Sequence, residues 1–343
     1  MHLTGRVHER GGKPASLAHG ATLTRGYVTA LVSAAFLSTT AIFVRHLTQT
    51  YHMPPLVLAF WRDGLVALTL WCVLRPLRPA LTRVKRQHLR YLILYGLALA
   101  IFNGLWILSV SLIGAALSTV LVYCSAGFTA LLGWWLLHER LDWSKLVAVG
   151  LCLGGCFLVS GVLDQAVWHA SLAGVVAGTL SGLGYSIYGL MGRSAAQRGL
   201  NPRTTVLYTF GFATLFLLFL NLLPAGLLPG FDTGPSNLLW LGNTLGGWAI
   251  LFVLAAGPTL SGFGLYNVSL GYLPSSVANL ILTVEPVFTA TLAYVLLGER
   301  LSGLQLGGSV TILTGVLFLR IHEGRLARQN LPEPGGDYRG QHS

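Results

Sequence analysis

The sequence predicts an all-α protein that crosses a membrane many times, and three observations support this. Of the 343 residues, 53% are hydrophobic and only 10% are charged, whereas about 25% are charged in an ordinary soluble domain. The apolar residues are gathered in runs of about 20, the length that a helix needs to cross a bilayer. These runs are continuously apolar rather than alternating with a period of two, so a barrel is not expected. The composition excludes a soluble enzyme or nucleic-acid-binding domain, although the formal net charge is +11.

Apolar runs of this length can be counted along the chain, and there are ten of them. They are residues 27–47, 55–75, 91–111, 115–136, 145–162, 171–191, 204–223, 246–267, 275–297 and 304–320. We therefore expect ten transmembrane helices between two tails, residues 1–26 and 321–343.

The basic residues are distributed unevenly over the two sides of such a protein. If the N-terminus is cytoplasmic, all of the 22 Lys and Arg residues except Arg45, Arg62 and Arg300 fall in cytoplasmic tails and loops. Cytoplasmic loops of membrane proteins carry an excess of Lys and Arg. Both termini are therefore expected in the cytoplasm.

The chain also repeats itself at an offset of 160 residues. Residues 128–131 (FTAL) correspond to residues 288–291 (FTAT), and residues 136–141 (LLHERL) correspond to residues 296–301 (LLGERL). The pattern divides the protein into two units of five predicted helices each. Because five is an odd number, the two units are expected to insert with opposite orientation.

The expected units are a first repeat over residues 27–162 and a second repeat over residues 171–320. Inverted repeats are an architecture of secondary transporters, which bind their substrate near the middle of the membrane between the halves. A transporter is the function that this organisation favours.

The repeated motifs resemble the EamA-type domain of the drug/metabolite transporter superfamily. The resemblance rests on two apolar helices that end in Leu-Leu-x-Glu-Arg-Leu, each before a Gly-rich helix, on Val284-Glu285-Pro286-Val287-Phe288, and on Phe60-Trp61-Arg62-Asp63. The first repeat has Ser125-Ala126 where the second has Glu285-Pro286, and so lacks the proline associated with a kink. The resemblance implies a ten-helix, gradient-driven carrier of small metabolites, often amino acids, in a bacterial inner membrane.

Glu285 lies near the middle of the predicted span 275–297. A carboxylate at that depth costs a few kcal/mol, so it has to face a cavity, find a partner or be protonated. A protonated Glu285 would suit a proton-coupled carrier, and a hydrogen-bonded structural role is the alternative.

Arg62 and Asp63 are the one basic–acidic pair inside a predicted span. Adjacent residues on a helix point about 100° apart, so we expect no salt bridge between them. Two interpretations stay open: Arg62 extends outward while Asp63 bonds a neighbouring helix, or Arg62 attracts a substrate carboxylate. The first two predicted helices of each repeat correspond at an offset near 148, which pairs Pro54 with Pro202. At this offset the second repeat has Phe210-Gly211 in place of Arg62-Asp63, and this asymmetry favours a binding role.

Further candidates for the substrate site are polar or aromatic residues within the predicted spans. They are Asn103, Trp106, Tyr123, Tyr185, Tyr266 and Asn279. The pairs Glu139-Arg140 and Glu299-Arg300 are expected to end helices at the membrane interface, with a gating salt bridge as the alternative.

The sequence has no phosphate loop, nucleophile elbow or HExxH motif, so we expect neither an enzyme nor an ATP-driven pump, and no cofactor or metal. The expected partners are a small-molecule substrate, the lipid bilayer and protons, without nucleic acid. Efflux of amino acids or related metabolites by alternating access is the favoured function. The alternatives are a multidrug or cation efflux carrier, in which Glu285 binds the cation, and a membrane-embedded enzyme or scaffold.

The predicted orientation can be tested by labelling. In a variant without the native cysteines, Asp232→Cys is expected to react with a membrane-impermeant thiol reagent in intact cells, whereas Arg83→Cys is expected to react only after permeabilisation. Reaction at position 232 only after permeabilisation would refute the orientation, and the inverted repeat with it.

Overall fold

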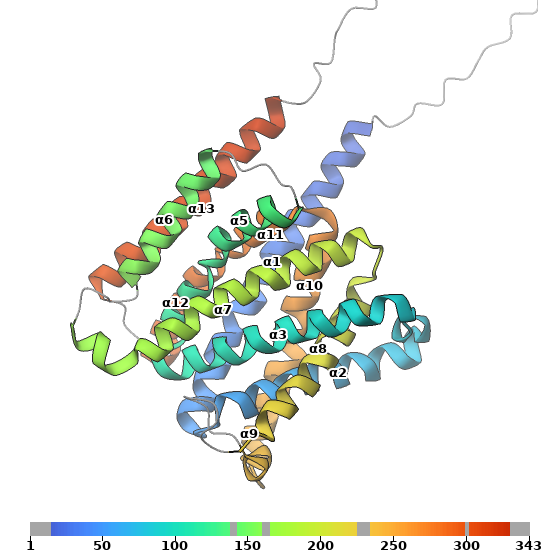
Figure 1. The fold of residues 1–343 in the computed structure, drawn as a ribbon, viewed down its shortest axis with the longest axis vertical. Helices are drawn as coiled ribbons and strands as arrows, with labels where there is room; N and C mark the ends of the chain where they lie inside the picture. The colour runs from blue at the N-terminus through green and yellow to red at the C-terminus, as the bar shows by residue number, and fades with distance from the viewer. Residues whose placement is uncertain (1–14, 138–142, 160–164, 225–233, 299–301, 330–343) are drawn as a thin grey trace, which may run out of the picture.

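The computed structural model describes residues 15–137, 143–159, 165–224, 234–298 and 302–329, and these ranges contain helices and no strand (Figure 1). The first half consists of α1 (Ala15–Thr50), α2 (Pro55–Leu77), η1 (Pro79–Thr82), α3 (Arg86–Ile113), α4 (Ala115–Val122), α5 (Ser125–Leu137) and α6 (Trp143–Val159). The second half consists of α7 (Gln165–Gln197), α8 (Pro202–Asn221), η2 (Pro235–Leu239), α9 (Leu245–Leu254), the π-helical turn η3 (Ala255–Thr259), α10 (Leu260–Tyr272), α11 (Ser275–Leu282), α12 (Glu285–Leu297) and α13 (Gly303–Gln329).

The prediction of an all-helical protein is confirmed, and each of the ten predicted ranges contains helix. Six helical segments in the described ranges are long and apolar enough to cross a membrane: Thr24–Thr50, Pro55–Leu77, Arg86–Ile113, Ala115–Leu136, Pro202–Asn221 and Leu245–Tyr272. Large apolar side chains are exposed on the outside of the bundle, among them Leu68, Trp135 and Phe219. Such surfaces are suited to contact with lipid rather than water.

Two of the predicted spans are divided in the middle. Residues 115–136 form α4 and α5, which are separated at Tyr123 and Cys124, and residues 275–297 form α11 and α12, which are separated at Thr283 and Val284. The two breaks lie 160 residues apart, the offset of the sequence repeat. The break in the first repeat therefore forms without a proline.

At both breaks the backbone hydrogen bonds join residues three apart in the sequence instead of four. The N–H of Tyr123 donates to the carbonyl of Val120 at 3.1 Å, and the N–H of Val284 donates to that of Ile281 at 3.3 Å. These tighter turns keep backbone groups paired in a bundle where water is scarce. Glu285 lies in the middle of the range 275–297, and because the helix is broken there it is in the first turn of α12.

The helices pack in pairs that follow the repeat. Helix α1 runs along α10 and α3 runs along α7, while α2 packs on α8 and α6 on α13 (Figure 1). The repeat makes α7 the counterpart of α1, and α10 the counterpart of α3. The α1–α10 and α7–α3 contacts are therefore equivalent by the repeat. In the α2–α8 and α6–α13 pairs, each helix packs on its own counterpart in the other repeat.

Two half-buried arginines, one in each repeat, make equivalent contacts in these helix pairs. Arg45 at the end of α1 donates from Nη1 to the carbonyls of Val110 and Ser111 near the end of α3, at 3.0 and 2.9 Å. Arg193 on α7 donates from Nη1 to the carbonyl of Leu270 near the end of α10, at 2.9 Å. A guanidinium at a helix C-terminus pairs carbonyls that the helix leaves free.

Figure 1 shows the start of α1 and the end of α13 at the same end of the bundle. The residues Glu139, Arg140, Glu299 and Arg300, for which a helix-end or gating role was considered, lie outside the described residues.

The contact between α3 and α8 depends on Gly96. A Cβ at this position would meet Cβ of Phe212 and would lie 3.0 Å from both the N of Ala213 and the carbonyl oxygen of Thr209. We expect Gly96→Ala to lower the free energy of unfolding by about 1–3 kcal/mol, as overpacking does. Thermal unfolding of the detergent-purified protein measures this.

Gly211 on α8 provides the matched control, because a Cβ there meets nothing within 4 Å. Gly211→Ala is expected to leave stability unchanged or to raise it by up to about 1 kcal/mol, the helix propensity of alanine over glycine. Equal unfolding midpoints for the two variants would contradict a close α3–α8 contact at Gly96.

Candidate functional site

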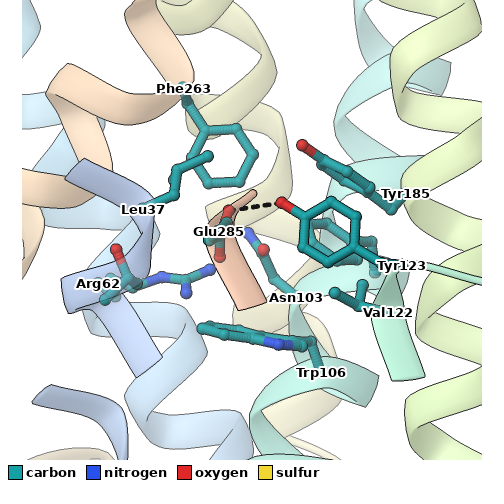
Figure 2. A pocket seen from close by; sticks show the side chains of 11 residues that line it. Leu37, Arg62, Asn103, Trp106, Val122, Tyr123, Tyr185, Phe263 and Glu285 are labelled. Atoms are coloured by element: carbon teal, nitrogen blue, oxygen red, sulfur yellow. Dashed lines mark hydrogen bonds between the residues drawn. The ribbon is translucent and has the colours of Figure 1, made fainter. Parts of the chain in front are cut away.

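A small cavity of about 30 Å³, lined by buried side chains, lies where the two halves meet (Figure 2). Residues of both halves line it: Leu37, Thr40, Arg62, Phe102, Asn103, Trp106, Val122, Tyr123, Tyr185, Phe263 and Glu285. A single water needs about 10–15 Å³, so the cavity has room for about two water molecules. A metabolite fits only if the surrounding helices move apart.

Arg62 and Asp63 form an ion pair at the edge of this cavity. Both side chains are 0% exposed, and Nε and Nη2 of Arg62 donate to Oδ1 of Asp63 at 3.2 and 3.1 Å. The expectation that adjacent residues would not form a bridge is therefore wrong. The long arginine side chain folds back to its neighbour, because a buried charge without a partner costs far more than a bent side chain.

Asn103 on α3 completes the contacts of the Asp63 carboxylate. Its Nδ2 donates to Oδ2 of Asp63 at 2.7 Å, so that both carboxylate oxygens accept hydrogen bonds. This network joins α2 to α3 and fixes the direction of the Arg62 guanidinium, which in Figure 2 extends over the Trp106 ring. The carbon of the guanidinium lies 5.8 Å from the centre of that ring, within range of a cation–π contact.

The network leaves two polar atoms available at the cavity. Nη1 of Arg62 and Oδ1 of Asn103 are buried and have no hydrogen-bond partner among the described residues. Buried polar atoms are almost always paired, so each unpaired one needs an explanation. Here a charged donor and a neutral acceptor belong to residues that line one cavity, an arrangement suited to a polar ligand group.

Glu285 and Tyr123 meet across the cavity from the two helix breaks. The Tyr123 hydroxyl donates to Oε2 of Glu285 at 2.6 Å (Figure 2). Tyr123 directly follows α4 and Glu285 begins α12, so this hydrogen bond joins the break of one repeat to the break of the other. Glu285 is only 6% exposed, and no basic side chain of the described residues forms an ion pair with it.

Aromatic rings form the remaining wall. Tyr185 packs against Phe102 with ring centres 5.1 Å apart and stacks on Tyr266 at 5.6 Å. Tyr266 therefore supports the wall from behind and does not line the cavity. The hydroxyl of Tyr185 has no hydrogen-bond partner among the described residues.

The repeat shows that this site is asymmetric. Phe210 corresponds to Arg62, and Phe263 corresponds to Asn103 at the offset of 160. Phe210 and Phe263 pack edge to face with ring centres 5.3 Å apart. One half thus contributes an ionic network where the other contributes an aromatic pair.

The structure brings six of the nine candidate residues together around the cavity: Arg62, Asn103, Trp106, Tyr123, Tyr185 and Glu285. Of the other three candidates, Asp63 accepts hydrogen bonds from Arg62 and Asn103, and Tyr266 stacks behind Tyr185. Asn279 lies elsewhere, where its Nδ2 donates to Thr129 Oγ1 at 2.9 Å and to Ser125 Oγ at 3.3 Å.

Five lining residues were not among the candidates: Leu37, Thr40, Phe102, Val122 and Phe263. The repeat offset would have indicated Phe263 as the counterpart of Asn103. Leu37 and Val122 carry no signal in the sequence, because they are apolar residues in apolar runs.

Comparison with known proteins identifies the family. The model of the EamA-like transporter family matches residues 24–161 and again residues 172–321. The chain belongs to the EamA-like transporter family. One protein of known crystal structure aligns with 87% of this chain over 98% of its own length. The TM-score is 0.61 at 16% sequence identity, which shows a shared fold.

Among its relatives, this family member is 30% identical over 283 residues to a probable amino-acid metabolite efflux pump of Salmonella typhimurium, covering 81% of the chain and 89% of that protein. It is also 27% identical to the threonine/homoserine exporter RhtA of the same species over 67% of the chain and 70% of the exporter. These similarities and the apolar helices indicate a multi-pass membrane protein that acts as a small-molecule efflux transporter.

The buried ion pair predicts an unequal response to mutation. Asp63→Leu leaves the Arg62 guanidinium without its partner and is expected to destabilise the protein by about 3–5 kcal/mol. The double variant Arg62→Met, Asp63→Leu removes both charges and is expected to recover most of that loss. The free energies of unfolding of the wild type, the single variant and the double variant are compared in detergent. A double variant as unstable as Asp63→Leu would contradict this account.

Proposed function

We propose that this protein exports amino acids or closely related small metabolites as a secondary active transporter, through alternating access to the cavity between its halves. The observation that carries the proposal is that a carboxylate and a guanidinium with an N–H unpaired among the described residues line one cavity between the halves. The cavity is too small for a metabolite in this conformation, so binding requires the halves to separate. Motion of two repeats around a central site is how such carriers expose the site to each side in turn.

The proposed architecture is ten membrane-spanning helices in two inverted repeats, residues 27–162 and 171–320, in the inner membrane of a bacterium. The tails, residues 1–26 and 321–343, would both be cytoplasmic. Three observations support this arrangement. Helices of one repeat pack on equivalent helices of the other, the two helix breaks lie at equivalent positions, and the start of α1 lies at the same end of the bundle as the end of α13. The excess of basic residues in the tails and in the loops predicted to be cytoplasmic supports this orientation.

Arg62 is proposed to bind the substrate carboxylate. Two of its nitrogens are used by Asp63, and Nη1 remains free at the cavity. The Asp63 and Asn103 contacts orient the guanidinium before the substrate arrives, which reduces the entropy lost on binding. The aromatic wall of Phe102 and Tyr185 would then face the rest of the substrate.

Glu285 is proposed to couple transport to the proton gradient. It is buried and has no basic partner among the described residues, where its hydrogen-bond donor is Tyr123 of the opposite repeat. A carboxyl group in this position can take up or release a proton when the halves separate. It can also bind the ammonium group of a substrate in place of the proton.

A multidrug or cation carrier is the second candidate. Glu285 lies in one cavity with the rings of Trp106, Tyr123 and Tyr185, and aromatic rings together with a carboxylate are suited to organic cations. Such a carrier would need Glu285 but not Arg62. The response to Arg62 variants therefore separates the two candidates.

Glu285→Gln tests the coupling role. The glutamine amide oxygen can still accept the hydrogen bond from Tyr123, so the variant is expected to insert and fold normally. Because it cannot exchange a proton, it is expected to lose concentrative, gradient-driven transport in proteoliposomes while still exchanging substrate across the membrane.

Glu323→Gln in α13 is the control, since it removes a carboxylate elsewhere in the chain and leaves Glu285 unchanged. It is expected to transport as the wild type does. Concentrative transport by Glu285→Gln with an unchanged pH profile would remove Glu285 from the coupling role.

Arg62→Lys tests recognition of the carboxylate. Lysine keeps the positive charge but loses the planar guanidinium that serves Asp63 and the substrate together. Affinity for an amino acid is expected to fall about tenfold, roughly 1.4 kcal/mol, while affinity for the decarboxylated amine changes little. Competition assays with an amino acid and its amine provide the measurement.

Arg193→Lys is the matched control, because Arg193 donates only to a backbone carbonyl at the end of α10. It is expected to leave both affinities unchanged. Equal losses for the amino acid and the amine in Arg62→Lys would make Arg62 structural and would favour the cation carrier.

A further inference from the structure

A second, larger cavity opens on the outside of the bundle between α1, α2, α8 and α10. This groove has a volume of about 580 Å³ and is lined by Phe36, Leu70, Val73, Leu74, Leu77, Arg78, Arg203, Val206, Leu260, Ser261, Gly264, Leu265 and Val268. Its walls are almost entirely apolar, and Phe36, Val73 and Leu77 are 42%, 47% and 73% exposed. A groove of this kind in the outer surface of a membrane protein faces lipid.

Among the described residues that line the groove, two arginines are the only charged ones, and both lie at the same end of it. Arg78 follows the last residue of α2, and Arg203 is in the first turn of α8. Both are exposed, and neither guanidinium has a hydrogen-bond or ion-pair partner in the part of the chain that the structure describes. Of the lining residues, none is acidic.

The positions of these arginines are fixed by contacts between η1 and α8. Thr204 Oγ1 donates to the carbonyl of Leu81 at 2.8 Å, and the Tyr208 hydroxyl donates to the carbonyl of Thr82 at 2.9 Å. These bonds hold the segment after Arg78 against the first turns of α8, where Arg203 lies. The backbone positions from which the two arginine side chains extend are therefore held at the mouth of one groove.

The groove has the length of one lipid chain. It extends along α2 from Arg78 to Leu70, and along α10 from Val268 to Leu260. Eight residues of helix span about 12 Å, and half of the hydrocarbon core of a bilayer is about 15 Å thick. The groove thus reaches from the arginines at the end of the bundle nearly to the middle of the membrane.

We propose that this groove binds an anionic phospholipid, with its phosphate between Arg78 and Arg203 and an acyl chain along the apolar wall. Guanidiniums pair with phosphate oxygens through two parallel hydrogen bonds. Basic pockets between transmembrane helices on the cytoplasmic side are suited to anionic headgroups, and this end of the bundle carries the predicted cytoplasmic loops. The site is separate from the central cavity and does not depend on what the protein transports.

Binding of phosphatidylglycerol and phosphatidylcholine with identical acyl chains tests the proposal, measured on the detergent-purified full chain by native mass spectrometry. The wild type is expected to bind phosphatidylglycerol more tightly. Arg78→Gln and Arg203→Gln are each expected to weaken its binding about fivefold, without an effect on phosphatidylcholine. Arg90→Gln is the control, because Arg90 is an exposed arginine near the start of α3 that does not line the groove.

Gly264→Leu tests the acyl-chain part of the site without changing any charge. A Cβ at Gly264 meets nothing within 4 Å, so leucine can enter the groove without disturbing the helices. This variant is expected to weaken phosphatidylglycerol binding while keeping the unfolding midpoint of the lipid-free protein.

Three results would overturn the proposal. Equal affinity of the wild type for the two lipids would exclude a headgroup site. An equal loss in Arg90→Gln would show only a general attraction by the basic surface. Competition by inorganic phosphate as effective as that by phosphatidylglycerol, together with normal binding by Gly264→Leu, would show an anion site that holds no lipid.

Discussion

The ion pair between Arg62 and Asp63 is the interaction on which the site depends. A guanidinium inside a bundle surrounded by lipid is tolerated only if its charge is balanced and its donors are paired. Asp63 balances the charge, and Asn103 pairs the second carboxylate oxygen, so that three side chains on two helices hold one another. The pairing is incomplete in one respect, since Nη1 of Arg62 remains free at the cavity. The cost of that unpaired donor is the physical reason to expect a ligand there.

The two helix breaks provide the second constraint. A chain that leaves the helical path inside a membrane has to pair its backbone groups in another way. The tight turns at Tyr123 and Val284 do so, and Ser186 of α7 donates to the carbonyl of Ser125 at 3.0 Å. Gly182 allows this approach, since a Cβ there would lie 3.0 Å from the carbonyl oxygen of Val122. The breaks bring Tyr123 and Glu285 within hydrogen-bond distance across the repeat boundary.

The sequence was sufficient for the all-helical fold class and for six of the residues that line the cavity, because these depend on a regular pattern or on a rare residue. A charge in an apolar run is conspicuous, and this identified Arg62, Asp63 and Glu285. The Arg62–Asp63 bridge was not predictable from helix geometry, because it depends on how far a flexible side chain bends when water is excluded. The break at Tyr123 was missed because the first repeat has no proline there, and packing against α7 stabilises it instead.

The symmetry of the scaffold and the asymmetry of the site fit together in the proposed mechanism. Since α1–α10 and α7–α3 are equivalent contacts, opening the cavity to one side by loosening one of them, or to the other side by loosening its counterpart, would give two conformations with nearly the same packing. Two such conformations would be close in free energy, so a small differential affinity of substrate or proton could shift the population between them. The substrate itself has no such symmetry and needs a fixed orientation. Arg62 in one half, with Phe210 at the equivalent position of the other, supplies that orientation without altering these equivalent helix pairs.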